Sequence, residues 1–143
     1  MEFCTFEVEG LRFGVQVDRV QEVLRPQPMT PVPRSSHVVM GLINLRGQIV
    51  TAIDLRRRLE MPDREDPGAA MNVVVRTDSG PVSLLVDVIG DVVTTGDIAC
   101  DPPPDTLRGV ARELILGAYQ LTDRLLLQLD VDRAVEIPVG AGR

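Results

Sequence analysis

An internal repeat constrains the fold more than any other feature of this sequence. The stretch VDRVQEV at residues 17–23 returns as VDVIGDV at 86–92, and a hairpin pattern precedes each copy. A second block repeats at one constant offset: Gly41, Leu45, Asp54, Arg57, Leu59 and Glu60 match Gly117, Leu121, Asp130, Arg133, Val135 and Glu136. Duplication followed by loop drift leaves constant offsets within blocks and a longer insertion between the blocks of one copy. The alternative is a chance match, since alternating Val and Leu align easily.

Apolar residues alternate with polar ones in the pattern of β-strands. Residues 3–8 and 11–17 have period-two alternation, and Glu9-Gly10 between them predicts a two-residue hairpin turn. The runs at 42–45 and 48–53 are nearly continuously apolar, which suits strands covered on both faces, with a turn at Arg46-Gly47. Each copy therefore offers roughly five short strands and a helical cap, which predicts an all-β fold with short helices, built as two small five-stranded β-barrels of the SH3-like or OB type.

Two short helices are predicted from capping signals. Asp18 is a candidate N-cap for a helix through Leu24, since Gln21 stands at the capping-box position and Pro26 stops the pattern. Asp54 is a candidate N-cap for a helix of one or two turns that ends at Pro62.

Three consecutive arginines, Arg56 to Arg58, follow Asp54 in the second of these helices. Consecutive helical residues fan around most of the circumference, so the arginines cannot form one phosphate clamp, and we expect a solvated surface run. Residues 62–70 are the most linker-like segment of the chain. They separate the expected repeat subdomains, at about 1–62 and 71–138.

Composition and charge exclude several classes of function. The net charge is −6, with no Trp and a single Tyr, so we expect no nucleic-acid partner. Cys4 and Cys100 lack a Cys-x-x-Cys spacing and a nearby His, which predicts two reduced, buried thiols and no metal site. No apolar run approaches the ~20 residues that cross a bilayer, and acids stand where a signal peptide carries bases. We expect a cytoplasmic protein without direct membrane insertion.

Catalytic motifs are missing from the sequence. The single histidine is His37, beside a proline-rich loop, and no serine lies in a Gly-x-Ser-x-Gly motif. Neither Gly-x-Gly-x-x-Gly nor a Walker loop occurs, so no cofactor is expected. Asp87 and Asp91 could pair as catalytic carboxylates, but their counterparts in the first copy, Asp18 and Glu22, favour a structural pattern. We predict no catalytic residues and no enzymatic activity.

The motif NLRG followed by IV-x-x-IDLR resembles the CheW family, adaptors that couple bacterial chemoreceptors to the histidine kinase CheA. The likeness also includes FEVEGLRFGV, VDRVQEVL, VDVIGDV and the closing GAYQLTDRLLLQLDVDRAV, and so spans nearly the whole chain. It departs from the family at Thr51-Ala52, where members commonly have Pro followed by an aliphatic residue.

The resemblance implies one CheW-like domain over residues 1–143, with two five-stranded barrels around a shared core and with strands that can exchange between the subdomains. It also implies two partners. One is the cytoplasmic hairpin tip of a chemoreceptor, which meets the groove between the barrels. The other is the CheA regulatory domain, itself CheW-like. Such a protein would be recruited to membrane-associated or cytoplasmic receptor arrays.

Carried over from the family, the receptor-binding residues are Val20, Glu22, Gly41, Arg46, Val73 and Ile89. Arg46 would be held by Glu22 and would present a planar donor fork to a polar residue of the receptor. From the residues alone, the alternative is an arginine that is merely solvated at a hairpin tip.

Two other functions remain open. One is a CheW-like adaptor for a non-flagellar pathway, such as gliding or pilus motility. The other is a barrel that binds a small ligand or nucleic acid, which the acidic charge and the low aromatic content disfavour.

Overall fold

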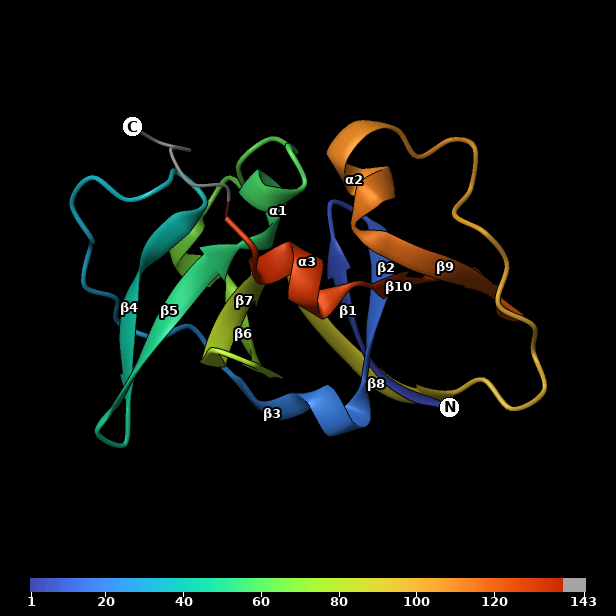
Figure 1. Cartoon of the computed structure of the whole chain (residues 1–143), viewed down its shortest axis with the longest axis horizontal. Coiled ribbons are helices and arrows are strands. Elements are labelled where there is room, and N and C mark those ends of the chain that lie inside the picture. Colours follow the sequence, from blue (N-terminus) through green and yellow to red (C-terminus); the bar gives the residue numbers. More distant parts are fainter. Residues whose placement is uncertain (138–143) are drawn as a thin grey trace.

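The computed structural model describes residues 1–137, which form two five-stranded sheets (Figure 1). The first sheet has the order β8-β1-β2-β10-β9, with β1 (Glu2–Val8), β2 (Leu11–Gln16), β8 (Val88–Thr94), β9 (Ile115–Gln120) and β10 (Leu125–Leu129). The second has the order β3-β6-β7-β5-β4, with β3 (Val20–Leu24), β4 (Val39–Leu45), β5 (Gln48–Asp54), β6 (Met71–Thr77) and β7 (Gly80–Val86). The helices are short: α1 (Leu55–Arg58), α2 (Gly109–Glu113), α3 (Val131–Val135), and the 3₁₀ turns η1 (Val17–Arg19) and η2 (Pro67–Ala69). The predicted all-β class with short helices is confirmed.

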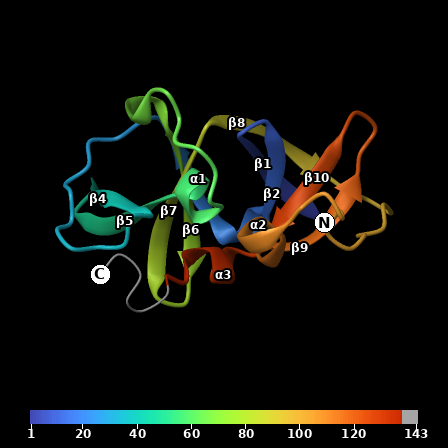
Figure 2. The ribbon, with the colours of Figure 1, turned by 90° about the horizontal axis from the view of Figure 1, so that it is seen from above.

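Each sheet takes strands from both repeats. The first sheet combines β1 and β2 with β8, β9 and β10, whereas the second combines β6 and β7 with β3, β4 and β5. The chain crosses from the first sheet to the second at η1 and returns at Asp87, between β7 and β8. Figure 2 shows the two sheets side by side, with α1, α2 and α3 around the junction between them. Each sheet therefore mixes the segments 1–62 and 71–138.

Both predicted hairpins are present. Glu9 and Gly10 turn the chain between β1 and β2, and Arg46 and Gly47 turn it between β4 and β5, all four with positive φ. Such a pair of left-handed residues matches the twist of the strands that it joins.

Asp54 caps α1 as predicted, because its Oδ1 accepts a hydrogen bond from the backbone N–H of Arg56 at 3.1 Å. The helix ends at Arg58, sooner than the predicted stop at Pro62.

The helix predicted after Asp18 is wrong. Residues 17–19 form a single 3₁₀ turn, and Val20–Leu24 is strand β3, which pairs antiparallel with β6 from Val20 opposite Val75 to Leu24 opposite Asn72. The apolar spacing fits a helix, but so short a helix is unstable by itself, and the open edge of β6 offers a hydrogen-bond ladder instead. Tertiary pairing decided this segment.

The largest apolar cluster lies between the sheets. Phe6 and Phe13 of the first sheet pack there with Val73 and Leu84 of the second and with Leu55 of α1, and all five are almost fully buried. Smaller clusters lie within each sheet, around Ile43, Val50 and Leu85 in the second and around Phe3, Tyr119 and Leu126 in the first. Because burial of apolar area is the main stabilising term, the two sheets fold around a shared core.

Repeat glycines allow a second segment to cross each sheet closely. A Cβ atom on Gly41 would lie 2.7 Å from the carbonyl oxygen of Thr30, and one on Gly117 would lie 2.8 Å from that of Asp101. Thr30 and Asp101 each form an isolated β-bridge beside the respective glycine. The glycines recur because the same close backbone approach recurs in both repeats.

Candidate functional site

Four of the six predicted site residues lie on end strands of the sheets, and one of them is Gly41 on β4. Val20 and Glu22 lie on β3, and Ile89 lies on β8, its repeat equivalent (Figure 1). A register shift interrupts the pairing of β3 between Val20 and Glu22, and another interrupts the pairing of β8 with β1. Bulges of this kind are typical of sheet edges and re-aim side chains.

Exposed valines accompany these edge strands. Val23 on β3 and both Val88 and Val92 on β8 are large apolar side chains left open to solvent. Sequence reasoning missed them as surface residues. The register shift on β8 between Ile89 and Val92 interrupts the alternation from which exposed positions would be predicted. Apolar side chains beside unpaired strand edges are typical of surfaces that bind other proteins.

Glu22 and Arg46 form an ion pair, with Arg46 Nη2 donating to Glu22 Oε2. Glu22 lies on β3 and Arg46 follows β4, and these strands stand at opposite ends of the second sheet. The pair therefore shows that the sheet curls until its two ends approach each other. Gln21 Nε2 also donates to Glu22 Oε2, at 3.4 Å, and supports the carboxylate from its own strand.

The pair stays charged at neutral pH. The hydrogen bond from Arg46 lowers the pKa of Glu22, and the same bond raises the pKa of Arg46. The Glu22 side chain is 21% exposed and that of Arg46 is 69% exposed. Because Arg46 is so open, its guanidinium presents its remaining donors to solvent, in a planar arrangement that suits a carboxylate or an amide oxygen.

Three of the other predicted site residues are buried or half-buried. Val73 is 1% exposed and lies on β6 opposite Val23, so its side chain supports β3 from within the core. Gly41 is buried against the segment at Thr30. Ile89 is half-buried on β8 and packs against the core between the sheets.

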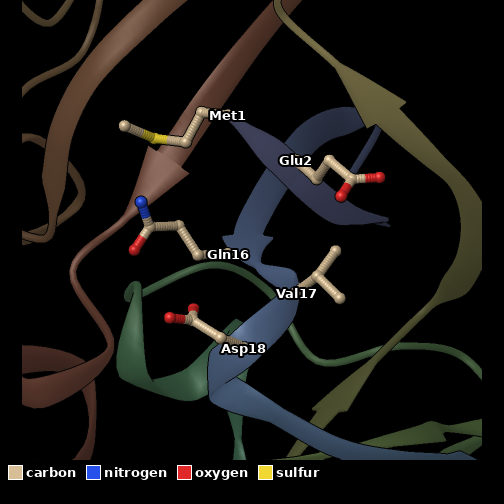
Figure 3. A pocket seen from close by; sticks show the side chains of 5 residues that line it. All are labelled: Met1, Glu2, Gln16, Val17 and Asp18. Atoms are coloured by element: carbon tan, nitrogen blue, oxygen red, sulfur yellow. The ribbon is translucent and has the colours of Figure 1, made fainter.

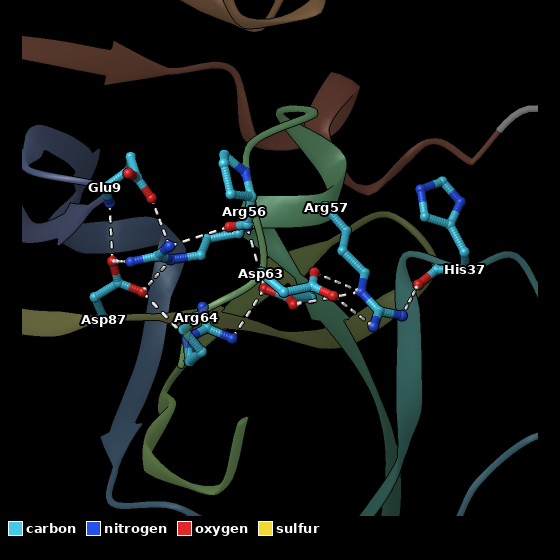
Figure 4. Close-up of polar contacts among 9 residues, drawn as sticks. Glu9, His37, Arg56, Arg57, Asp63, Arg64 and Asp87 are labelled. Carbon is cyan, nitrogen blue, oxygen red and sulfur yellow. Dashed lines mark hydrogen bonds and ion pairs between the residues drawn. The ribbon is translucent and has the colours of Figure 1, made fainter. Parts of the chain in front are cut away.

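A cluster of charged residues, the Asp87 cluster, lies where the chain returns to the first sheet (Figure 4). The Asp87 carboxylate accepts from Arg56 Nη2 at 2.7 Å, from Arg64 Nε at 3.2 Å and from the backbone N–H of Glu9 at 2.8 Å. Arg56 also pairs with the Glu9 carboxylate, and Arg64 Nη1 pairs with Asp54 at 3.1 Å. Burial by itself raises the pKa of Asp87, but these hydrogen bonds outweigh it and lower that pKa below its usual value.

The prediction that Arg56 to Arg58 form a solvated run is wrong. Arg56 belongs to the Asp87 cluster, Arg57 pairs with Asp63 at 3.0 Å, and Arg58 donates to backbone carbonyls of α3. The three side chains do point in different directions around the helix, as expected. Each of them nevertheless finds a carboxylate or carbonyl partner, because α1 lies at the junction of the two sheets. The linker-like segment at residues 62–70 is also held at this junction. Its Arg64 side chain pairs with Asp54 and is only 8% exposed.

Several cavities open on the surface of residues 1–137. A cavity of about 320 Å³ is lined by Met1, Glu2, Gln16, Val17 and Asp18. Figure 3 shows that these side chains point in different directions and converge on no common point. Among residues 1–137, no three His, Cys, Asp or Glu side chains are grouped to hold a metal ion.

The cysteines differ from each other in exposure. Both are free thiols, Cys4 half-buried and Cys100 exposed, so the prediction of two buried thiols is wrong for Cys100. Within the described chain, no helix has the length and apolar character needed to span a membrane.

Comparisons with known proteins agree on one family. A family model described as a CheW-like domain matches residues 2–138. The chain is 30% identical over 131 residues to the chemotaxis protein CheW of Rhizobium meliloti, covering 92% of this chain and 84% of that protein. It is also 36% identical over 123 residues to Protein FrzA of Myxococcus xanthus, covering 83% of this chain and 74% of that protein.

A solved structure has the same fold. The scaffolding protein TtCheW from Thermoanaerobacter tengcongensis superposes with a TM-score of 0.83 at 22% identity, covering 95% of this chain and 88% of that one. The family model spans almost all of the repeat-built domain described above. This chain belongs to the CheW family.

Proposed function

We propose that this protein is a non-enzymatic adaptor that couples chemoreceptors to a CheA-type histidine kinase. The observation that carries the proposal is the Glu22–Arg46 ion pair, which holds an exposed guanidinium at the edge of a sheet whose end strand also exposes Val23. Family membership supports it, and so do the names of a relative, a chemotaxis protein, and of a structural neighbour, a scaffolding protein. The function then lies in binding, without a chemical step.

The receptor surface would lie along β3 and β8. The exposed valines supply apolar contact for one face of a helical hairpin, and Arg46 supplies a directed polar contact. Val20, Glu22, Arg46 and Ile89 lie at or near this surface. Gly41 and Val73 are buried and would act through the backbone and the packing that support it.

The kinase surface would pair this protein with the CheW-like regulatory domain of its kinase. Two double-sheet domains of one fold can meet through equivalent ends, and we expect a total buried area of about 1,600 Å² or somewhat less. An interface of this size is compatible with a Kd on the order of 1 μM. By joining both partners, the protein would work beside receptor arrays, at the membrane or in the cytoplasm.

The test uses purified full-length protein, the cognate kinase regulatory domain and a receptor fragment with the hairpin tip. Calorimetry should give saturable binding to each partner, and a ternary complex should elute together in gel filtration. If neither partner binds at concentrations of about 100 μM, well above the expected Kd, the coupling role is wrong.

A second candidate is an adaptor of the same kind in another output pathway. The identity to Protein FrzA of Myxococcus xanthus favours keeping it, because that relative does not carry the chemotaxis name of the others. Identification by mass spectrometry of the kinase and the receptor that co-purify from native lysate would separate the two pathways.

A further inference from the structure

The chain crosses between the two sheets twice, and an ion pair links each crossover to a short helix. We call these two helices, α1 and α3, the cap helices. At η1, where the chain leaves the first sheet, Arg19 Nη2 pairs with Asp132 of α3 at 2.8 Å. At the return crossover, Asp87 pairs with Arg56 of α1 at 2.7 Å. The two helix residues are repeat equivalents, because Asp132 stands in α3 at the position of Arg56 in α1. The crossover residues are offset by one position, since Asp87 matches Asp18 and Arg19 matches Val88.

The charges are reversed between the two crossovers. At η1 the crossover supplies the arginine and the helix supplies the aspartate, whereas at Asp87 the crossover supplies the aspartate and the helix supplies the arginine. Each pair nevertheless links a crossover to the short helix beside it, through helix residues that occupy equivalent positions in the two repeats.

The return crossover is held more tightly. Arg56 and Asp87 are 16% and 18% exposed, whereas Asp132 at the other crossover is 58% exposed. Asp87 also receives Arg64 from the segment between the repeats and the backbone N–H of Glu9. Shielded pairs with several hydrogen bonds resist screening by salt, and open pairs contribute little.

Asp87 connects the two sheets through different atoms. Its backbone N–H donates to the carbonyl oxygen of Glu7 in β1 at 3.0 Å, which fixes it to the first sheet. Its carboxylate is held by Arg56, which follows β5 of the second sheet, and by Arg64, which itself pairs with Asp54 at the end of β5. Strand β8 begins at the next residue, Val88.

We propose that Asp87, together with Arg56 and Arg64, is a positioning cluster that sets the orientation of the two sheets and thereby the spacing between β3 and β8. The part concerning the receptor rests on the proposed function, since β3 and β8 are there the docking strands. The Arg19–Asp132 pair is the weaker counterpart and does not determine the orientation.

The first arm of the test measures the separation of the sheets without any partner. Spin labels are placed at Ile49→Cys on the second sheet and Leu116→Cys on the first, both exposed positions, in a Cys4→Ala, Cys100→Ser background. Double electron–electron resonance then gives the distance distribution. Asp87→Asn should shift or broaden it, and Asp132→Asn, the matched control at the equivalent crossover, should leave it unchanged.

Milder and compensating variants keep the test decisive if Asp87→Asn unfolds. Arg64→Gln should give an intermediate change. The double variant Arg56→Asp, Asp87→Arg recreates the charge order of the other crossover and should restore part of the parent distribution. An unchanged distribution in folded Asp87→Asn or Arg64→Gln protein overturns the proposal.

The second arm measures binding of the receptor fragment. Asp87→Asn should weaken it about tenfold, a loss of about 1.4 kcal/mol, and Asp132→Asn less than twofold. The two arms separate the two hypotheses. A parent protein that fails to bind the receptor refutes the proposed function and leaves the distance result standing, whereas unchanged distances with normal binding refute only the positioning cluster.

Discussion

Arg58 in α1 and Ala134 in α3 occupy equivalent positions in the two repeats, and they contact each other. Arg58 Nε donates to the carbonyl oxygen of Ala134 at 2.9 Å, and its Nη2 donates to the carbonyl oxygens of Arg133 and Glu136. These carbonyls lie at the carboxyl end of α3, where a helix has unsatisfied acceptors and a partial negative charge. The cap helices of the two sheets are therefore joined where the repeats meet.

Replacing Arg58 with Ala should destabilise the fold by about 2 kcal/mol, because a charged donor to several half-buried carbonyls is lost. Urea unfolding followed by circular dichroism measures the change. Arg112→Ala is the matched control, since Arg112 donates to the Pro103 and Pro104 carbonyls from an exposed position, and its effect should stay within about 0.5 kcal/mol. Equal losses for both variants would contradict the role given to Arg58.

Replacing Gly41 with Ala should cost about 1–3 kcal/mol, because the new Cβ would lie 2.7 Å from the Thr30 carbonyl oxygen and the backbone must shift. Thermal melts of parent and variant give the difference. Gly68→Ala serves as the control, since its Cβ would meet only the flexible Asp66 side chain at 3.4 Å. If the Gly41→Ala protein has the same melting temperature as the parent, the segment at Thr30 moves aside without a measurable loss of stability.

Replacing Arg46 with Ala should weaken binding to the receptor fragment while hardly changing thermal stability, because the arginine is largely exposed. Arg46→Glu should bind more weakly than Arg46→Ala. Adding Glu22→Arg to Arg46→Glu should recover part of the loss, and a double-mutant cycle should give a non-zero coupling energy. If the two losses simply add, or if Arg46→Ala binds like the parent, Arg46 is only a solvated side chain.

Acid should weaken the Asp87 cluster. The folded-state pKa of Asp87 is lowered relative to the unfolded chain, so its contribution to stability is fully present above the unfolded value of about 4 and is lost as pH falls through the folded value. Unfolding free energies measured from pH 6 down to about 2 should therefore decline less steeply in Asp87→Asn than in the parent. Parallel pH profiles for the two proteins would show that Asp87 carries no such linkage.

Local patterns in the sequence predicted the elements whose causes are local. The hairpins at Glu9-Gly10 and Arg46-Gly47 follow from two-residue turns between alternating or apolar runs, and Asp54 caps the helix that follows it. The repeat also indicated two equivalent units, and the glycine at position 41 returned at 117 for one steric reason. Each of these depends on residues close in the chain or on a pattern that recurs in it.

Interactions between segments that are far apart in the sequence could not be predicted from local patterns. The segment Val20–Leu24 has apolar spacing that fits a helix, yet it forms an edge strand because β6 offers unpaired backbone groups beside it. The sequence near Arg64 has the composition of a linker, and only the meeting of Asp54 and Asp87 in space explains why that arginine is buried.

The sequence by itself therefore determined the β class, the repeat, the turns and the family, because these features follow from local periodicity and from the order of motifs along the chain. Only the tertiary structure decided which strands share a sheet, and it placed Glu22 beside Arg46 and Asp87 between Arg56 and Arg64. The physical reason is that backbone pairing and ion pairing depend on distance in space, and alternating apolar residues bury equally well against either sheet.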